Sequence, residues 1–148
     1  MSASTIWFDR HVGHWAYPVH RWLYEHTGGR VGRSSPMGPM LLLTTTGRKS
    51  GQPRTTPLLY VPEGSEFLVV ASNGGRDQPP AWLGNLRSRP EATVQVGPER
   101  VAVVAEILVG ADKEAVWSTL MAQYRGWDEY QKLTSREIPA VRLRRAGP

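Results

Sequence analysis

The sequence predicts a mainly β protein with α-helices, folded as an antiparallel barrel that helices decorate. Six or so short apolar segments, rich in β-branched residues, are typical of strands, and most of them are separated by tight turns. Hairpin-linked strands of this kind favour an antiparallel barrel. With 148 residues, of which 40% are hydrophobic and 21% charged, the chain is long enough for one domain with a substantial core.

Residues 1–39 are predicted to form an amphipathic helix followed by a linker. Apolar side chains recur every three or four positions between residues 5 and 24, at Phe8, Val12, Trp15, Val19 and Trp22. Pro18 is expected to kink or divide this helix. Packing on the core is one interpretation of its apolar face, and peripheral contact with a membrane is the other. Residues 27–39, rich in Gly, Ser and Pro, are interpreted as the linker.

The barrel domain is predicted over residues 40–148 and opens with a hairpin. Residues 40–46 form an apolar, β-branched run, and a second strand is expected from about residue 54 to 61. Between them lies the loop Gly47–Gln52, called the cation loop below, whose two glycines permit a tight turn with exposed N–H groups. Three cations surround those donors, namely Arg48, Lys49 and Arg54. Such a loop suits a phosphate or carboxylate, and an ordinary solvated turn is the alternative.

A short buried strand over residues 67–71 is followed by small residues, Ser72-Asn73-Gly74-Gly75. Small residues at a strand end let a flat ligand approach the backbone closely. A plain Asn-Gly-Gly turn explains the same residues. Trp82, Leu83 and Leu86 then recur at helical spacing after two prolines, which predicts a short helix over residues 80–88.

The C-terminal part is predicted to hold two strands, two helices and a closing strand. The strands cover residues 92–96 and 101–109 and are joined by a tight turn. Asp112 is expected to cap a helix whose face includes Val116, Leu120 and Tyr124, and a second helical segment covers residues 125–133. An alternating strand over residues 138–143 ends the fold. Tyr124, Trp127 and Tyr130 are three residues apart, so on a helix they form one aromatic wall, facing either the core or a substrate.

The charge balance favours anionic partners without choosing among them. The net charge is +5, the isoelectric point is near 10.0, and only Lys49, Lys113 and Lys132 among the 18 cations are lysine. Arginine's planar fork suits bidentate contact with phosphate and carboxylate. The absence of cysteine, of a signal peptide and of a long apolar run is consistent with a cytoplasmic protein. Association with the inner face of the membrane, through the first helix, is an alternative.

Several catalytic classes find no support in the residues. There is no cysteine and no Gly-x-Ser-x-Gly elbow, and the four histidines all fall in the N-terminal segment. Asp and Glu lie mostly in turns and caps, and no His/Asp/Glu group has metal-ligand spacing, so no metal site is predicted. An enzyme with this sequence is therefore expected to use the chemistry of a cofactor.

Three motifs resemble the deazaflavin-dependent nitroreductase and F420H2-dependent quinone reductase family of actinobacteria. They are Thr44–Arg54, Val69–Gly75 and Trp82–Leu86, and the likeness extends from about Met40 to the end of the chain. The resemblance implies a split β-barrel related to the flavin-binding barrels of flavin reductases. It also implies an oxidoreductase that binds coenzyme F420 and passes a hydride from its reduced form to a quinone-like or nitro acceptor.

Carried over residue by residue, the resemblance implies a set of contacts along this cofactor. Lys49, Ser50, Gln52 and Arg54 would hold the phosphate and acidic tail, with Arg48 and Gly51 close by. Along the deazaflavin ring would lie Thr56, Pro57, Leu58, Ala71, Ser72, Asn73, Gly74 and Gly75. Trp82 and Asn85 would contact the tail or its linker. The acceptor would be bordered by Ser72, Tyr124, Trp127 and Tyr130, and the proton donor would be Tyr124, Ser72 or solvent.

Two positions depart from the family's pattern, and two other functions stay open. Thr56 stands where an Asn before the proline is common, which bears on one contact with the ring. Trp127 stands where the family can have a tyrosine, which leaves the choice of acceptor and any activity on nitroimidazoles open. An FMN- or haem-binding barrel of the same architecture is one alternative. A basic barrel that binds anions or single-stranded nucleic acid without catalysis is the other, but the predicted aromatics cluster at helix ends, so nucleic acid is not the expected partner.

Overall fold

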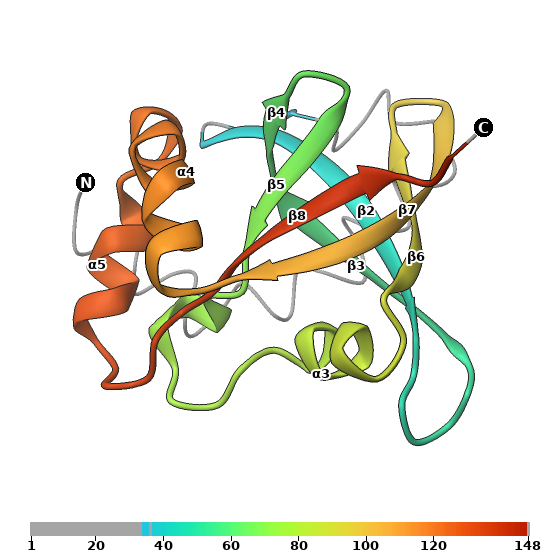
Figure 1. Cartoon of the computed structure of the whole chain (residues 1–148), viewed down its shortest axis with the longest axis horizontal. Helices are drawn as coiled ribbons and strands as arrows, with labels where there is room; N and C mark the ends of the chain where they lie inside the picture. The colour runs from blue at the N-terminus through green and yellow to red at the C-terminus, as the bar shows by residue number, and fades with distance from the viewer. Residues whose placement is uncertain (1–33, 36, 148) are drawn as a thin grey trace.

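A computed structural model of the chain describes residues 34–35 and 37–147. Labels follow Figure 1. The strands are β1 (Ser34–Ser35), β2 (Gly38–Thr46), β3 (Pro53–Leu59), β4 (Val61–Glu63), β5 (Glu66–Val70), β6 (Glu91–Val96), β7 (Glu99–Leu108) and β8 (Ala140–Arg145). The helices are α3 (Ala81–Ser88), α4 (Gly110–Gln123), α5 (Gly126–Lys132) and the 3₁₀ turn η1 (Asn73–Gly75).

The strands form one antiparallel sheet that curls into a split barrel, so the predicted fold class is confirmed. Hydrogen-bonded neighbours run in the order β1-β2-β6-β7-β8-β5-β4, and β3 pairs with β2. Because β3 and β4 are consecutive in the chain, the segment that contains them connects the β2 side of the sheet to the β5 side. In Figure 1, α3 lies across one end of the curled sheet, and α4 and α5 lie together on another side.

Alternation along the strands places apolar side chains on two faces and so produces two cores. Phe67 and Val69 of β5 point into the barrel, where they pack with Trp82, Leu83 and Leu86 of α3. The residues between them, Leu68 and Val70, face outward. They pack against the second core, which the helices α4 and α5 contribute through Val116, Leu120, Trp127 and Tyr130. The helices therefore cover both faces of β5.

The strand predicted over residues 54–61 is broken at Tyr60 into β3 and β4. Seven register pairs join β3 to β2, whereas β4 pairs with β5, so the chain changes partner strand at Tyr60. The Tyr60 N–H donates to the Pro39 carbonyl at 3.1 Å, and the Tyr60 carbonyl accepts from Gln123 Nε2 at 2.7 Å. Both main-chain groups are thus satisfied outside a ladder, which lets the strand break there.

The predicted cap of α4 by Asp112 is wrong. The helix begins at Gly110, whose N–H donates to Glu137 Oε2 at 2.9 Å, and Asp112 lies exposed in the first turn. A carboxylate from the connection before β8 therefore satisfies one of the donors left open at the helix start. Local spacing could not show this, because the partner is 27 residues away.

The N-terminal predictions fall largely outside the described residues. The helix over residues 5–24, its tryptophan-bearing face and the histidines belong to this segment, and the division into residues 1–39 and 40–148 stays a prediction. Within the predicted linker, Ser34 and Ser35 form the short strand β1 against Pro39 and Gly38, which the sequence did not predict. Among the described residues, no helix is long and apolar enough to cross a bilayer.

Candidate functional site

The cation loop is a closed turn that its own main chain holds in shape. The Gly47 N–H donates to the Gln52 carbonyl and the Gly51 N–H donates to the Gly47 carbonyl, both at 2.8 Å. Gly51 has φ +70°, in the left-handed region that glycine adopts without strain. Ser50 Oγ accepts from the Gln52 N–H at 3.1 Å and from an Arg54 guanidinium nitrogen at 3.3 Å. Short-range hydrogen bonds therefore order the loop into the tight turn that the sequence predicted.

Helix α3 fixes the loop to the barrel. The buried Asn85 accepts the Arg48 N–H on Oδ1 at 3.0 Å and donates from Nδ2 to Thr45 Oγ1 at 3.1 Å. The preceding residue, Gly84, has no side chain, and the Arg48 guanidinium packs against its main chain. A Cβ at Gly84 would collide with that guanidinium. Asn85 thus acts on the loop's position, and Gly84 sets the place of its first cation.

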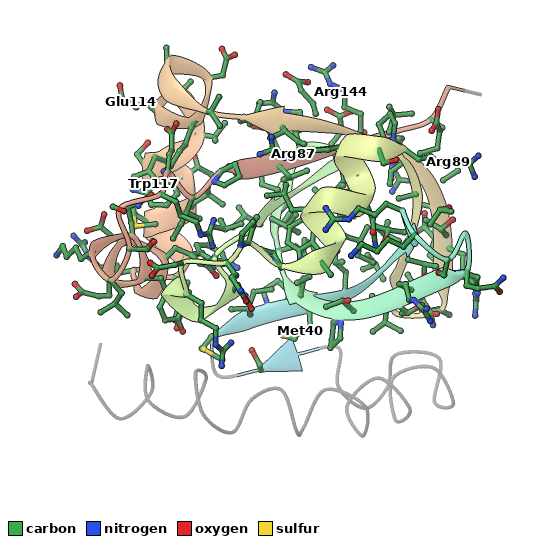
Figure 2. The ribbon with its side chains drawn as sticks, turned by 90° about the horizontal axis from the view of Figure 1, so that it is seen from below. Met40, Arg87, Arg89, Glu114, Trp117 and Arg144 are labelled. Carbon is green, nitrogen blue, oxygen red and sulfur yellow. The ribbon has the colours of Figure 1, made fainter. Side chains whose placement is uncertain are left out.

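The cations at this end of the molecule lack acidic partners. Among the described residues, no ion pair involves Arg48, Lys49 or Arg54, nor Arg87 and Arg89 at the end of α3. On the sheet, by contrast, Arg142 pairs with Glu63 and Glu106, Arg144 with Glu106, and Arg145 with Glu99. Figure 2 shows Arg87 and Arg89 beside α3, away from Glu114 and Trp117 of α4. Five cations without an ion pair among the described residues therefore lie around the cation loop and α3.

The cation loop, β3 and α3 border an open cavity of about 470 Å³. Its lining residues are Gly47, Arg48, Lys49, Ser50, Arg54, Thr55, Thr56, Ala81, Trp82 and Asn85. We call it the cationic cavity. Several long cationic side chains with exposed donors surround this space, an arrangement suited to an oxyanion group such as phosphate or carboxylate.

A second cavity, of about 270 Å³, continues from the first and is called the middle cavity. It shares Thr56, Ala81 and Trp82 with the cationic cavity, and its remaining lining residues are Leu58, Val70, Ser72, Asn73, Gly74, Pro79 and Pro80. Asn73, Gly74 and Gly75 have φ of 48°, 64° and 78° in succession, so the strand end turns through left-handed backbone beside the cavity. Because Gly74 has no side chain and those of Ser72 and Asn73 are short, a group in the middle cavity can approach this main chain closely.

A third space, of about 120 Å³, follows and is called the aromatic cavity. It shares Leu58, Val70 and Ser72 with the middle cavity and is also lined by Met37, Met40, Pro57, Leu59, Tyr124, Trp127 and Tyr130. The ring centroids of Tyr124 and Trp127 are 5.3 Å apart in an edge-on contact, and the hydroxyls of Tyr124 and Tyr130 are 3.0 Å apart. All three rings are at least nine-tenths buried. The three cavities together form one groove from cations to aromatics.

The aromatic wall forms, but not on the single helix that the spacing predicted. Tyr124 follows the last residue of α4 in an extended conformation, with φ −149° and ψ 105°, whereas Trp127 and Tyr130 belong to α5. The break turns Tyr124 back toward the other two rings. The pairing of Tyr124 with the other two was therefore right, and the assumed helical geometry was wrong.

Most of the residues that the resemblance singled out line this groove, and four do not. Gly51 borders a neighbouring cavity of about 480 Å³ with Ser88 and Arg89, and the Gln52 carbonyl closes the cation loop. Ala71 is fully buried in the barrel core, and a Cβ at Gly75 would meet the Tyr130 carbonyl at 2.8 Å. These four residues shape the walls. Eight lining residues were not predicted from the sequence: Met37, Met40, Thr55, Leu59, Val70, Pro79, Pro80 and Ala81. Thr55 could have been predicted, because it lies between Arg54 and Thr56.

The Ser72 hydroxyl is a further polar group of the groove. The Ser72 side chain lines both the middle and aromatic cavities, and no hydrogen bond from its hydroxyl to another described residue is recorded. That hydroxyl is therefore free to face a ligand. In the described part of the chain, no group of His, Asp and Glu side chains is arranged to hold a metal ion. The described side chains at the groove thus offer cations, hydroxyls and aromatic surfaces.

Comparison with known proteins identifies relatives of this chain. Residues 16–144 match the family described as F420H(2)-dependent quinone reductase. An F420H(2)-dependent quinone reductase of Mycobacterium tuberculosis is 40% identical over 143 residues, which cover 94% of this chain and 96% of that protein. A solved F420-H2 dependent reductase, FDR-A, has 37% identity and a TM-score of 0.65, covering 71% of this chain and 93% of its own. A domain-swapped dimer has 34% identity and a TM-score of 0.68, covering 85% and 93%.

Proposed function

Since this chain belongs to the F420H(2)-dependent quinone reductase family, we propose that it is an F420H2-dependent oxidoreductase that binds the coenzyme along its groove and reduces a quinone. The observation that carries the proposal is the order of the three cavities. Each shares lining residues with the next, so cations, a wall of small residues and aromatic rings follow one another in a single path. F420 has the same order of parts, an acidic tail and phosphate joined to a flat ring. Its reduced ring supplies a hydride when bound.

The cationic cavity fits the anionic part of the coenzyme. Arg48, Lys49 and Arg54 have no acidic side chain beside them among the described residues, so an incoming phosphate or carboxylate would not compete with a protein carboxylate. Ser50 adds a neutral hydroxyl. The sequence predicted exposed N–H groups in this loop, but those of Gly47, Arg48, Gly51 and Gln52 already donate within the protein, so the cationic side chains are the main donors. Lys49, Ser50 and Arg54 are the residues that we assign to the phosphate and the tail.

The middle cavity fits the ring, because its wall allows close approach. Gly74 is buried and carries no side chain, and Ser72 and Asn73 precede it on the same wall. Leu58 and Val70 provide apolar surface along the path toward the aromatic cavity. Thr56 lies where the cationic and middle cavities meet, so the departure from the family's Asn falls at the junction of tail and ring.

The aromatic cavity fits the acceptor. Tyr124, Trp127 and Tyr130 are buried aromatic walls that would hold a flat quinone and exclude water during transfer. Reduction of a quinone also consumes protons. The Tyr124 hydroxyl, linked to that of Tyr130 at 3.0 Å, and the Ser72 hydroxyl are the groups of this chain that we assign as candidate donors. Nitro compounds are a second acceptor class, for which Trp127 in place of a tyrosine is the discriminating residue.

The test is a titration of the purified protein with F420 and, in parallel, with FMN, followed by quenching of the cofactor's fluorescence. We expect F420 to bind tightly and FMN not to bind, and the reduced form to be oxidised by menadione in the presence of the protein. Retention of FMN or haem in place of F420 would favour the alternative cofactor. Binding of neither cofactor would overturn the proposed function and leave anion binding as the remaining property of the loop.

A further inference from the structure

The guanidinium of Arg136 donates hydrogen bonds to the main chain on either side of η1. Arg136 lies in the connection between α5 and β8. Its Nε donates to the Arg76 carbonyl at 2.9 Å, and one terminal nitrogen donates to the Ala71 and Ser72 carbonyls at 3.2 and 2.9 Å. A single side chain thereby joins the two ends of the segment 71–76, although it is 60 or more residues away in sequence.

The segment between those contacts needs support. Asn73, Gly74 and Gly75 take left-handed φ values in succession, and Asn73 is the only residue other than glycine with positive φ in the described chain. Such backbone is disfavoured for a residue with a Cβ. The turn η1 has three residues and no side-chain cap. Its own hydrogen bonds are local: the Gly75 N–H donates to the Ser72 carbonyl at 2.9 Å, and the Arg76 N–H donates to the Asn73 carbonyl at 3.2 Å. The contacts of Arg136 add a restraint from a distant part of the chain, which the local bonds cannot supply. Ser72, Asn73 and Gly74 form part of the wall of the middle cavity.

Arg136 is itself held by residues next to the aromatic cavity. Its carbonyl accepts from Gln131 Nε2 at 2.7 Å, and its N–H donates to Thr134 Oγ1 at 3.3 Å. Thr134 Oγ1 in turn donates to Asp77 Oδ1 at 2.8 Å, and Asp77 directly follows segment 71–76. Gln131 belongs to α5, the helix that carries Trp127 and Tyr130. The connection therefore ties the wall of the middle cavity to the wall of the aromatic cavity.

Only arginine fits this place among the basic residues. Burial lowers the pKa of Arg136 while the neighbouring Asp77 raises it, and an arginine still carries its charge at neutral pH. The planar fork reaches three carbonyls at once, whereas the ammonium of lysine is a single point on a flexible stem. Lysine would keep the charge and lose the simultaneous contacts.

We propose that Arg136 is a positioning residue that holds segment 71–76 against α5 and so sets the distance between the ring site and the acceptor site. The inference rests on the proposed function for its ligands, but the mechanical link concerns this chain's own residues. Its effect on binding passes through the main chain of Ser72, Asn73 and Gly74.

The experiment compares Arg136→Ala with Arg142→Ala in the full-length protein. Arg142 is the matched control because it is a partly buried arginine on β8 whose ion pairs with Glu63 and Glu106 lie on the sheet, outside the groove. Hydrogen exchange of the cofactor-free proteins, measured by mass spectrometry, reports the segment directly. We expect faster exchange in residues 72–76 and 126–133 in Arg136→Ala and unchanged exchange there in Arg142→Ala.

Binding is measured by F420 titration of the same proteins. We expect the Kd for F420 to rise roughly 10- to 100-fold in Arg136→Ala, as displacement of a positioned group does, and to stay within about twofold in Arg142→Ala. Free guanidinium, added well below denaturing concentrations, should restore part of the affinity in Arg136→Ala alone. If Arg136→Ala does not fold, Arg136→Lys takes its place and should show the same changes to a smaller degree.

The outcomes separate this inference from the proposed function. Unchanged exchange in residues 72–76 together with an unchanged Kd would overturn the role of Arg136, and so would an equal loss of affinity in Arg142→Ala. Failure of the unsubstituted protein to bind F420 would instead refute the proposed function. In that case the exchange comparison alone decides whether Arg136 holds the segment.

Discussion

Lys49 and Arg54 are the residues whose contribution to coenzyme binding is most directly testable. Both are exposed cations of the cationic cavity without an acidic partner among the described residues. We predict that Lys49→Ala or Arg54→Ala weakens F420 binding by about 1–3 kcal/mol, the usual cost of a lost charged hydrogen bond. Isothermal titration or fluorescence quenching measures this change.

The control for those variants is Arg144→Ala, which removes the same charge from the sheet, where Arg144 pairs with Glu106. Its affinity should match that of the unsubstituted protein. An F420 affinity that is unchanged in both loop variants would remove Lys49 and Arg54 from the coenzyme site. Equal weakening in all three variants would point to net charge instead of the loop.

Tyr124 is the hydroxyl that we expect to deliver the proton. It lies in the aromatic cavity and is linked to a second buried hydroxyl, that of Tyr130, which extends the path for proton delivery. We predict that Tyr124→Phe lowers the turnover number with menadione by about 100-fold, the lower range for loss of a general acid, and leaves F420 affinity unchanged. Stopped-flow oxidation of the reduced coenzyme gives both quantities.

Two further variants accompany Tyr124→Phe: Ser72→Ala as the test of the second candidate donor, and Tyr60→Phe as the control. Ser72 faces the same cavity, so its variant tests the other candidate donor, and Tyr60 packs against Phe67 and lies outside the groove. Tyr60→Phe should therefore turn over normally. Turnover that survived both Tyr124→Phe and Ser72→Ala would exclude these side chains as donors and assign the proton to solvent.

At the scale of elements, a substitution at the contact between α3 and the cation loop should affect the stability of the protein and its affinity for F420 in different ways. Gly84 lies inside α3, where alanine is favoured over glycine by about 1 kcal/mol. A Cβ there would displace only the far end of the Arg48 side chain. We predict that Gly84→Ala keeps or raises the melting temperature but weakens F420 binding several-fold, because the Arg48 guanidinium has to leave its place.

A double-mutant cycle tests whether Gly84→Ala acts through Arg48. If it does, Gly84→Ala has no further effect on F420 affinity once Arg48→Ala is present. Additive losses would contradict this explanation and indicate that the helix itself moves. A fall in melting temperature would contradict the stability half of the prediction.

Local pattern predicted the elements well, and long-range contacts account for what it missed. Alternation and turn residues placed β2, β5 and β8 within a few residues of their observed bounds. The break at Tyr60 depends on partners in Pro39 and Gln123, and the start of α4 depends on Glu137. No window of neighbouring residues contains these contacts, because the fold creates them.

The same distinction applies to the site. The cation loop could be predicted because its glycines and cations are contiguous and its hydrogen bonds are short-range. Arg136 could not, since its three carbonyl partners lie 60 to 65 residues earlier. Met37 and Met40 were missed for a related reason, because they reach the aromatic cavity only once β2 lies beside β3.

At the scale of the whole molecule, charge is arranged unevenly. The arginines of β8 form a row of ion pairs with Glu63, Glu106 and Glu99, so the sheet is locally neutralised. The net charge of +5 therefore has a large uncompensated share near the cation loop and the end of α3. A molecule with this layout draws an anionic ligand toward one end of its groove.

Ionic strength should therefore change the affinity for the coenzyme and leave the KM for a neutral acceptor unchanged. Uncompensated cations attract the phosphate and tail across solvent, and salt shortens the reach of that attraction from roughly 30 Å at 0.01 M to roughly 3 Å at 1 M. We predict that F420 affinity falls steadily over this range, whereas the KM for a neutral quinone at saturating coenzyme stays constant.

A deazaflavin that lacks the phosphate and tail is the matched ligand, and its affinity should not depend on salt. F420 affinity that is independent of salt would mean that the cations around the loop do not contact the tail. Salt dependence of the tail-less ligand would mean that ionic strength changes the protein itself, since that ligand offers the loop no anion.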